Sequence, residues 1–480
     1  MVVGGGHNGL VAAAYLARAG KRVVVLERLA HVGGAAVSTR PFDGVDARLS
    51  RYSYLVSLLP SRVVDDLSLP VQLSRRQYSS YTPDPSTGGR TGLLVGSGDD
   101  FASDFYTSCR SVTQALWPTM TEPLLSRSQA KQLVNADSAW AAMIEDPIGA
   151  AISRAVPDDL ARGVIATDAL IGTFARLDGA SLLQNVCFLY HVFRDWDVPI
   201  GGMGAVTDAL ASVATRYGAD ITTGAEVFKV TPDGDVYFRV HDDERRVHGR
   251  FVLANVTPTV LASLTGDEPP PSLPGSQVKV NLMLRRLPRL CDTGVTPEQA
   301  FGGTFHINET YSQLDSAFDQ AASGAVPDPL PCEIYCHSLT DPSILSPALR
   351  AAGAQTLTVF GVHTPHGVGN REDLTGAVLA SINSVLAEPI QDVVLPGCIE
   401  TKTTYDLEQT LGMTAGNIFH GGLTWPFAED DDPLDTPARR WGVQTRHERI
   451  LLCGAGSRRG GGVSGIGGHN SAMAVLESLA

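Results

Sequence analysis

Apolar and polar residues near the start of the sequence come in blocks that predict a β-strand, an α-helix and a second β-strand. A short apolar segment at residues 2–3 leads into a glycine-rich turn, and an apolar helix is expected over residues 10–19. Gly20 stands where a helix-ending glycine belongs. Residues 22–26 form a continuous apolar run, which is typical of a parallel strand covered on both faces. The pattern predicts a βαβ unit with an unusually short first strand.

Similar blocks return in the middle and at the end of the sequence. They predict a glycine turn with a helix over 201–217, strands over 224–230, 251–255 and 450–453, a glycine-dense loop over 454–468, and a helix over 470–479. Because these segments bracket the sequence, we expect an α/β fold with one discontinuous Rossmann-type domain formed by residues 1–75, 196–270 and 440–480. Residues 76–195 and 271–439 are expected to form an inserted α+β domain that binds the substrate.

A glycine motif, Gly4-x-Gly6-x-x-Gly9, lies between the first strand and the first helix. Gly4 permits a tight turn, Gly6 lets the backbone approach a pyrophosphate, and Gly9 lets the helix pack closely on the sheet. The helix N-terminus then offers free N–H groups to the phosphates. Glu27 follows at about the 20-residue distance where such folds place the acid that binds the adenosine ribose. Together these features predict a dinucleotide site.

Two further glycine groups favour FAD over NAD as the dinucleotide. Gly33-Gly34 provides a second place where the backbone can approach the diphosphate, which an extended FAD needs and NAD does not. Gly454, Gly456 and the run at 460–465 lie between a predicted strand and the last helix, so something other than a side chain is expected against this backbone. FAD is long enough to reach it. The last helix would then direct its positive end toward the flavin ring and stabilise negative charge there.

Charge and cysteine content narrow the classes of partner and the compartment. The sequence has 37 Lys and Arg against 51 Asp and Glu, a net charge of −14, which argues against nucleic acid and against electrostatic docking on anionic membranes. The 7 cysteines form no CxxC pair, which indicates reduced thiols and a cytoplasmic protein. Cys332, Cys336 and His337 have the look of a metal cluster, but residues 333–337 are better interpreted as a buried strand, so no metal site is predicted. No apolar run reaches the roughly 18 residues of a membrane span, and peripheral membrane contact stays open.

These motifs resemble the FAD-dependent phytoene desaturase and amine oxidase superfamily, and the resemblance extends over nearly the whole sequence. Residues 4–10, 33–37, 201–203, 416–421 and 460–463 look like the phytoene-dehydrogenase-like branch that includes the pyridine nucleotide-disulphide oxidoreductase domain 2 proteins. The resemblance implies noncovalently bound FAD. It is specific for the branch and does not identify a substrate.

The resemblance also implies contacts for individual residues. Glu27 would hold the adenosine ribose, Val227 would meet the adenine through its backbone, and residues 454–463 would border the ribityl chain and the ring. The residues expected at the cofactor are Gly4, Gly6, His7, Asn8, Gly9, Glu27, Arg28, Gly33, Gly34, Val227, Gly454, Gly456, Gly462 and Val463. Ala35-Ala36 stands where many superfamily members have an arginine, and Ala455-Gly456 where an acid is frequent. Phosphate and ribityl contacts are therefore expected mostly from the backbone.

The candidate catalytic residues are polar side chains in predicted loops. Flavin-dependent dehydrogenation needs a C–H bond held over flavin N5 and a base for a proton. His420 is the leading candidate for a residue near the ring, with a structural role in capping its turn as the alternative. His363 and His366, on either side of Pro365 in a predicted loop, are further candidates, and His469-Asn470 at the start of the last helix would either cap that helix or contact the flavin. Arg458-Arg459 is interpreted as a solvated loop pair rather than as a contact to an anionic substrate.

The sequence thus predicts an FAD-dependent oxidoreductase that transfers hydride between FAD and an apolar, isoprenoid- or polyene-like small molecule. A flavin amine oxidase is one alternative; it would need an aromatic cage and a lysine near flavin N5, for which Lys279 is the candidate. A prenyl-protein escort that has lost the flavin is another, although the intact Gly4, Gly6 and Gly9 argue against it. A flavin-bound scaffold with little turnover is the third. The oligomeric state is not predicted.

Overall fold

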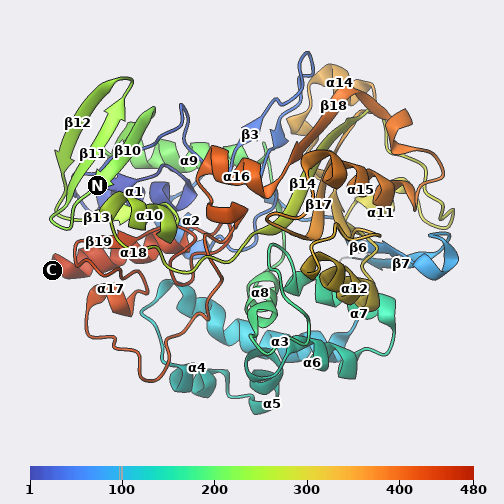
Figure 1. The fold of residues 1–480 in the computed structure, drawn as a ribbon, viewed down its shortest axis with the longest axis horizontal. Helices are drawn as coiled ribbons and strands as arrows, with labels where there is room; N and C mark the ends of the chain where they lie inside the picture. The colour runs from blue at the N-terminus through green and yellow to red at the C-terminus, as the bar shows by residue number, and fades with distance from the viewer. Residues whose placement is uncertain (97, 99–100) are drawn as a thin grey trace.

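Two large β-sheets, three smaller ones and a layer of helices make up the computed structural model, which describes residues 1–96, 98 and 101–480 (Figure 1). One sheet lies beside both termini, at the left of the view, and the larger sheet lies at the right. Helices from residues 103–192 lie below the larger sheet. The α/β class predicted from the sequence is confirmed.

The sheet beside the termini has five parallel strands in the order β19-β13-β1-β2-β9. The strands are β1 (Val2–Val3), β2 (Val24–Leu26), β9 (Asp220–Thr222), β13 (Val252–Ala254) and β19 (Ile450–Leu452). The central strand, β1, pairs with β2 on one side and β13 on the other. The helices α1 (His7–Arg18), α9 (Met203–Arg216) and α18 (Ile466–Ser478) pack on this sheet through a shared apolar core. The sheet therefore joins the beginning, the middle and the end of the chain.

Glycines allow α1 to lie unusually close to its neighbours. A Cβ atom on Gly9 would lie 2.2 Å from the carbonyl oxygen of Gly4, and one on Gly468 of α18 would lie 2.0 Å from that of Asn8. Van der Waals contacts between carbon atoms need about 3.5–4.0 Å. A side chain is therefore excluded at both positions, and the turn after β1 is held tightly against α1.

The larger sheet has seven strands in the order β18-β14-β17-β16-β15-β6-β7, antiparallel except for the pair β15–β6. The strands are β6 (Tyr78–Pro83), β7 (Gly92–Gly96), β14 (Ser276–Leu284), β15 (Thr304–Ile307), β16 (Cys332–Tyr335), β17 (Gln355–Pro365) and β18 (Val394–Lys402). Every residue of β14 is buried. The helices α11 (Pro297–Phe301), α12 (Tyr311–Ala322) and α15 (Arg371–Asn383) accompany this sheet.

The helical layer contributes one wall of the interior. Its helices are α3 (Ser103–Leu116), α4 (Arg127–Val134), α5 (Asp137–Trp140), α6 (Ile148–Ala155), α7 (Asp159–Ala166) and α8 (Leu183–Val192). Their shared core contains the fully buried Trp140 and Phe188. Within the described part of the chain, no helix combines the length and the apolar character needed to cross a membrane.

The remaining elements connect these layers. They are β3 (Ser38–Thr39), β4 (Leu49–Ser50), α2 (Ser61–Leu67), β5 (Leu73–Ser74), β8 (Val198–Pro199), β10 (Ala225–Val230), β11 (Asp235–Val240), β12 (Asp243–His248), α10 (Pro258–Thr265), α13 (His337–Thr340), α14 (Pro347–Ala351), α16 (Thr404–Leu411) and α17 (Pro437–Arg440). The short helical turn η4 (Thr167–Ala169) joins α7 to the loop before α8. β10, β11 and β12 form a separate antiparallel sheet.

Several predicted elements have different bounds in the structure, and in two of them the difference moves a candidate residue. The last helix was expected from residue 470, but α18 begins at Ile466, so His469 and Asn470 lie inside the helix. The strand expected over residues 333–337 ends at Tyr335, and His337 begins α13. In both places apolar patterning located the buried segment, while the turn that ends it depends on local backbone geometry.

Candidate active site

One cavity of about 610 Å³ is lined by residues of both sheets and of the helical layer. This volume is in the range of binding sites for small molecules and cofactors. Eleven of the residues expected at the cofactor or in catalysis line it. They are Gly4, Gly6, His7, Asn8, Glu27, Arg28, Gly34, Val227, His420, Gly462 and Val463.

The turn after β1 and the paired glycines meet at one edge of this cavity. Gly6 forms a bridge with Gly33, and the Gly33 N–H donates to the Gly5 carbonyl oxygen at 2.9 Å. Gly6 is the N-cap of α1, and no side chain in the described residues caps that end. The N–H groups of the first helical turn are therefore free to bind an anion. Such an arrangement of two backbone segments and one helix end fits a pyrophosphate.

Glu27 has a structural role besides the one expected for it. Its Oε2 accepts a hydrogen bond from the Gly5 N–H at 2.7 Å, and its Oε1 accepts one from the Leu29 N–H at 2.7 Å. The side chain is buried yet lines the cavity. Asn255, which follows β13, also lines the cavity and donates from Nδ2 to the Gly4 carbonyl oxygen at 3.0 Å. The acid and the amide together fix the glycine turn.

Four glycines expected at the cofactor do not line the cavity: Gly9, Gly33, Gly454 and Gly456. Each lacks a side chain for reasons of packing. A Cβ atom on Gly33 would lie 2.7 Å from Val37, one on Gly454 3.0 Å from Asn255, and one on Gly456 2.7 Å from Pro258. These glycines are therefore needed for packing. The sequence shows that they lack a side chain, but it does not show whether the space left free faces the cavity or a packed neighbour.

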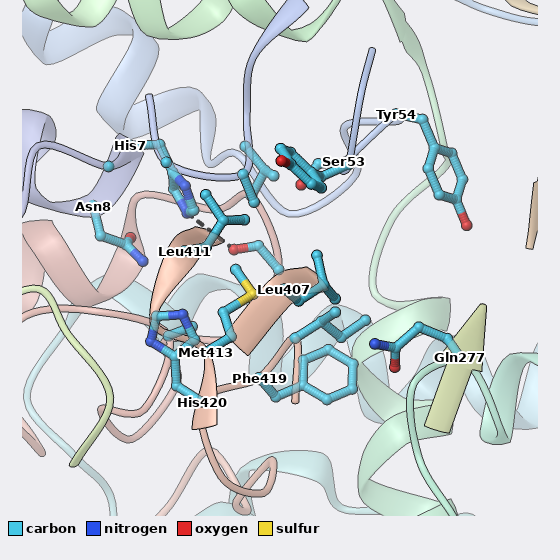
Figure 2. Close-up of a pocket in the computed structure, with 18 of the residues that line it drawn as sticks. His7, Asn8, Ser53, Tyr54, Gln277, Leu407, Leu411, Met413, Phe419 and His420 are labelled. Carbon is cyan, nitrogen blue, oxygen red and sulfur yellow. Dashed lines mark hydrogen bonds between the residues drawn. The ribbon is translucent and has the colours of Figure 1, made fainter. Parts of the chain in front are cut away.

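His7 and His420 stand together at one side of the cavity, with Met413 beside them (Figure 2). His7 Nε2 lies 3.1 Å from the Gly462 carbonyl oxygen, so this nitrogen carries the proton and donates. His420 has a left-handed backbone with φ of 62°, and its Nδ1 has no partner among the described residues. Burial lowers the pKa of both histidines to about 4, and for His420 the neighbouring His7 lowers it further. Both rings are neutral at pH 7.

Lys279, the lysine considered for an amine oxidase, faces the cavity from β14. Its Nζ donates to the carbonyl oxygens of Ser50 at 2.7 Å and Tyr52 at 2.6 Å, and it lies 4.8 Å from the centre of the Tyr54 ring. Burial holds the pKa of this amine well below its usual range. In Figure 2, Tyr54 lies across the pocket from the two histidines.

The far end of the cavity carries acidic side chains that sequence reasoning missed. Asp168, His306 and Glu333 line it, together with Arg76. Glu333 Oε1 accepts a hydrogen bond from the Thr167 hydroxyl at 3.0 Å, and its Oε2 accepts one from the Tyr335 hydroxyl. Burial raises the pKa of Glu333 to about 6 and that of Asp168 to about 8. A carboxylate inside an apolar strand was the one local sign of this group.

The remaining candidates lie outside the cavity lining. His363 is fully buried and edge-on to Phe174 and Phe318, and His366 bonds to Thr404 from Nδ1 at 3.1 Å. His469 and Asn470 bond to each other within α18. Arg459 was interpreted as solvated, which is wrong: it is 1% exposed and donates to three backbone carbonyl groups, those of Thr119, Glu122 and Trp441.

We expect the variant His363→Asn to lose about 2.5 kcal/mol less stability than the parent protein when the pH is lowered from 7 to 4.5. Burial lowers the pKa of His363 to about 3, and neither ring nitrogen has a partner within the described chain. The unfolded chain binds the proton and the folded chain does not, so stability is lost as the pH falls below the unfolded pKa of about 6.5. Asparagine tolerates the φ of 57° at this position.

Urea unfolding of both proteins at the two pH values measures this difference. The same substitution at the exposed His31 is the control and should leave the pH dependence of stability as in the parent. Equal losses in the parent and the His363→Asn variant would show that the ring is protonated in the folded state.

Comparison with known proteins agrees with this geometry. The family of NAD(P)-binding Rossmann-like domains matches residues 2–62. Over 100% of its length the chain is 63% identical to the Mycobacterium tuberculosis protein Rv0897c, of which it covers 97%. It is also 29% identical over 100% of its length to pyridine nucleotide-disulfide oxidoreductase domain-containing protein 2 of Rattus norvegicus, of which it covers 93%.

Among solved structures, putrescine oxidase bound to putrescine has the same fold. Its TM-score is 0.60 at 16% sequence identity, with 100% of this chain and 98% of that chain covered. The predicted resemblance is therefore confirmed at the level of fold and of branch. The chain carries a dinucleotide-binding Rossmann-like domain and belongs to the family of Rv0897c, with pyridine nucleotide-disulfide oxidoreductase domain-containing protein 2 as a more distant homologue.

Proposed function

We propose that this protein is an FAD-dependent oxidoreductase that transfers hydride between noncovalently bound FAD and a small molecule with a largely apolar body. The observation that supports this best is the continuity of one cavity. Its lining includes the uncapped end of α1, Glu27 and Val227, Gly462, and the acidic side chains Asp168 and Glu333. A plain nicotinamide site needs the first part of this path only, whereas an extended FAD and a second reactant together need all of it.

The residues along this path fit FAD. The first turn of α1 and Gly34 would hold the diphosphate, Glu27 the ribose, and the backbone of Val227 the adenine. Gly462 and Val463 would border the flavin ring. When bound, FAD supplies the hydride acceptor at its N5 atom. The oxidoreductase names of the family relative and of the structural neighbour agree with this assignment.

The protein's own residues hold and orient the reactants. His7 donates to the Gly462 carbonyl oxygen and so fixes the glycine loop against α1. His420 presents an unpartnered nitrogen, and because its ring is neutral at pH 7 it can accept a proton at that atom. Apolar side chains from several elements, among them Leu55, Ile171 and Phe360, line the cavity and would exclude water from the substrate's body.

The visible absorption spectrum of the purified protein tests this function. We expect a flavin spectrum and, after denaturation, release of free FAD into solution. Added NADH or candidate substrates under anaerobic conditions should then bleach the flavin. A colourless protein that does not take up added FAD would contradict the proposal and favour a lipid or prenyl-protein escort. If the protein carries flavin and no candidate reduces it, the result would favour a flavin-bound scaffold with little turnover.

A further inference from the structure

The far end of the cavity holds more buried carboxyl groups than cationic partners. Asp168 in η4 and Glu333 in β16 line the cavity, and Glu309, whose carboxylate lies within 4.8 Å of that of Glu333, is 1% exposed. Glu309 Oε2 and His306 Nδ1 share a hydrogen bond of 2.6 Å, while Glu309 Oε1 is buried without a partner among the described residues. The Asp168 carboxyl likewise has no hydrogen-bond or ion-pair partner in the described chain. Two acidic side chains therefore keep unused acceptor atoms in a buried place.

The cations near this cluster are engaged elsewhere. Arg76 donates to the Thr304 hydroxyl at 2.7 Å and lies 5.7 Å from the centre of the Tyr335 ring. It makes no ion pair with any carboxylate of the described residues. Lys279 is held by two backbone carbonyl groups. His306 is neutral, because burial lowers its pKa to about 4. If all three carboxyl groups were ionised, the cluster would carry excess negative charge.

Without a ligand, this excess is relieved by protonation. Burial raises the pKa of Glu309 to about 8, and burial together with Glu333 and Glu309 raises that of Asp168 to about 8. Both acids are therefore mostly protonated at pH 7. A buried cation would reverse this, because an opposite charge within a few ångströms favours the ionised carboxylate. Arg76 lowers the pKa of Asp168 only in part, so the cluster would gain from a second positive group beside it.

Aromatic rings line the same end of the cavity. Tyr54, Tyr106, Trp196 and Tyr335 are all among its lining residues, and the rings of Tyr54 and Tyr335 are 4.7 Å apart. The faces of such rings attract organic cations and also accept an apolar chain. Carboxyl groups beside aromatic rings thus match a ligand that has both a cationic group and an apolar chain.

We propose that this end of the cavity binds the protonated amine of a substrate through Asp168 and Glu333, with the apolar body of that substrate lying against the neighbouring rings. This inference rests on the proposed function, whose substrate class it narrows from an apolar molecule to an apolar amine. Two other ligands compete with the amine. A carboxylate would use Arg76, and a divalent metal ion would use His306, Glu309 and Glu333, whose ligand atoms all lie within 4.8 Å of one another.

The geometry favours the amine over both competitors. The 2.6 Å hydrogen bond between His306 and Glu309 closes the space that a metal ion would need between them. A carboxylate at Arg76 would add a fourth acid to a cluster of three. An ammonium group needs only the open side of Asp168 and Glu333.

Three probes with the same apolar body distinguish these cases: octylamine, octanol and octanoate, titrated into the flavin-loaded protein by isothermal calorimetry. We expect octylamine to bind at least about tenfold more tightly than octanol, and octanoate to bind more weakly than either. Octylamine binding at pH 7 should release a proton from Asp168, so its apparent enthalpy should differ between buffers of different ionisation enthalpy. Octanol binding should release none.

Two isosteric variants locate the effect. Asp168→Asn and Glu333→Gln should each weaken octylamine binding at least about tenfold, leave octanol binding unchanged, and in the case of Asp168→Asn remove the proton release. Asp315→Asn, which removes a carboxylate of α12 outside the cavity lining, is the matched control and should change nothing. The flavin content of each variant, read from its absorbance, verifies that the site has folded.

Three outcomes would overturn the inference: equal binding of octylamine and octanol, tightest binding of octanoate, or stoichiometric binding of added Mn²⁺ or Zn²⁺ that Glu333→Gln abolishes. These results are independent of the proposed function, which fails if the protein carries no flavin. If the protein carries flavin but does not prefer the amine, only the proposed substrate class is rejected, and the proposed function stands.

Discussion

The variant Gly9→Ala is expected to lose the FAD that we propose as its cofactor and to unfold with a free energy about 3 kcal/mol lower than the parent protein. A Cβ atom at this position would lie 2.2 Å from the Gly4 carbonyl oxygen and 2.9 Å from Asn255 Nδ2. Both contacts are with groups that build the turn after β1, so α1 would have to move outward. That movement withdraws the free N–H groups of its first turn from the diphosphate. FAD content after purification and urea unfolding measure the two effects.

A glycine in open space provides the matched control. Gly376 lies within α15, has an ordinary helical backbone, and has no described atom within 4 Å of the place that a Cβ atom would take. Gly376→Ala should therefore raise stability by roughly 0.5–1 kcal/mol through the lower entropy of the unfolded chain. Gly9→Ala protein that purifies with a full complement of FAD would disprove the role assigned to the close approach of α1.

The variant Arg459→Ala is expected to lower the free energy of unfolding by about 3–5 kcal/mol. The guanidinium of Arg459 donates to the carbonyl oxygens of Thr119, Glu122 and Trp441, at 2.8, 2.7 and 3.1 Å. Burial lowers the pKa of this group only to about 10, so it remains charged at pH 7. Its loss leaves three buried acceptors without donors and a void where the side chain was.

The neighbouring arginine separates this effect from a general loss of charge. Arg458 donates to the Phe427 carbonyl oxygen at 2.6 Å and lies 3.3 Å from Asp432 in a partly exposed ion pair, so Arg458→Ala should cost no more than about 1 kcal/mol. Arg459→Lys should recover only part of the stability, since one ammonium group cannot reach all three carbonyl oxygens. Urea unfolding at pH 7 compares the three variants. An Arg459→Ala midpoint equal to that of the parent would show that water replaces the guanidinium at no cost.

Sequence reasoning succeeded where the signal is local. The turn Gly4-x-Gly6, the first helix and Glu27 all lie within one βαβ unit, and each is required by backbone geometry that can be inferred from neighbours in sequence. The same reasoning could not decide which glycines face the cavity. Gly454 and Gly456 lack side chains because Asn255 and Pro258 press on them, and those contacts join segments far apart in the chain.

The acidic end of the cavity could not have been predicted from the sequence. Asp168, His306 and Glu333 come from a helical turn and two different strands, and no spacing relates them. Arg459 was misjudged for a related reason. A charged residue in a glycine-rich loop is ordinarily solvated, and only the fold brings three carbonyl groups around it. Both cases depend on long-range packing that one sequence does not reveal.

The central position of β1 in its sheet has a consequence for how the protein is made on the ribosome. β1 is synthesised before the other four strands of its sheet, yet one of its two neighbours, β13, follows about 250 residues later, and β19 follows about 200 residues after that. At about 5–20 residues per second, synthesis of these 480 residues takes roughly 24–96 s. During most of this time an apolar strand has an unpaired edge. We therefore expect the nascent chain to need chaperone protection, and the cofactor to be loaded only after release.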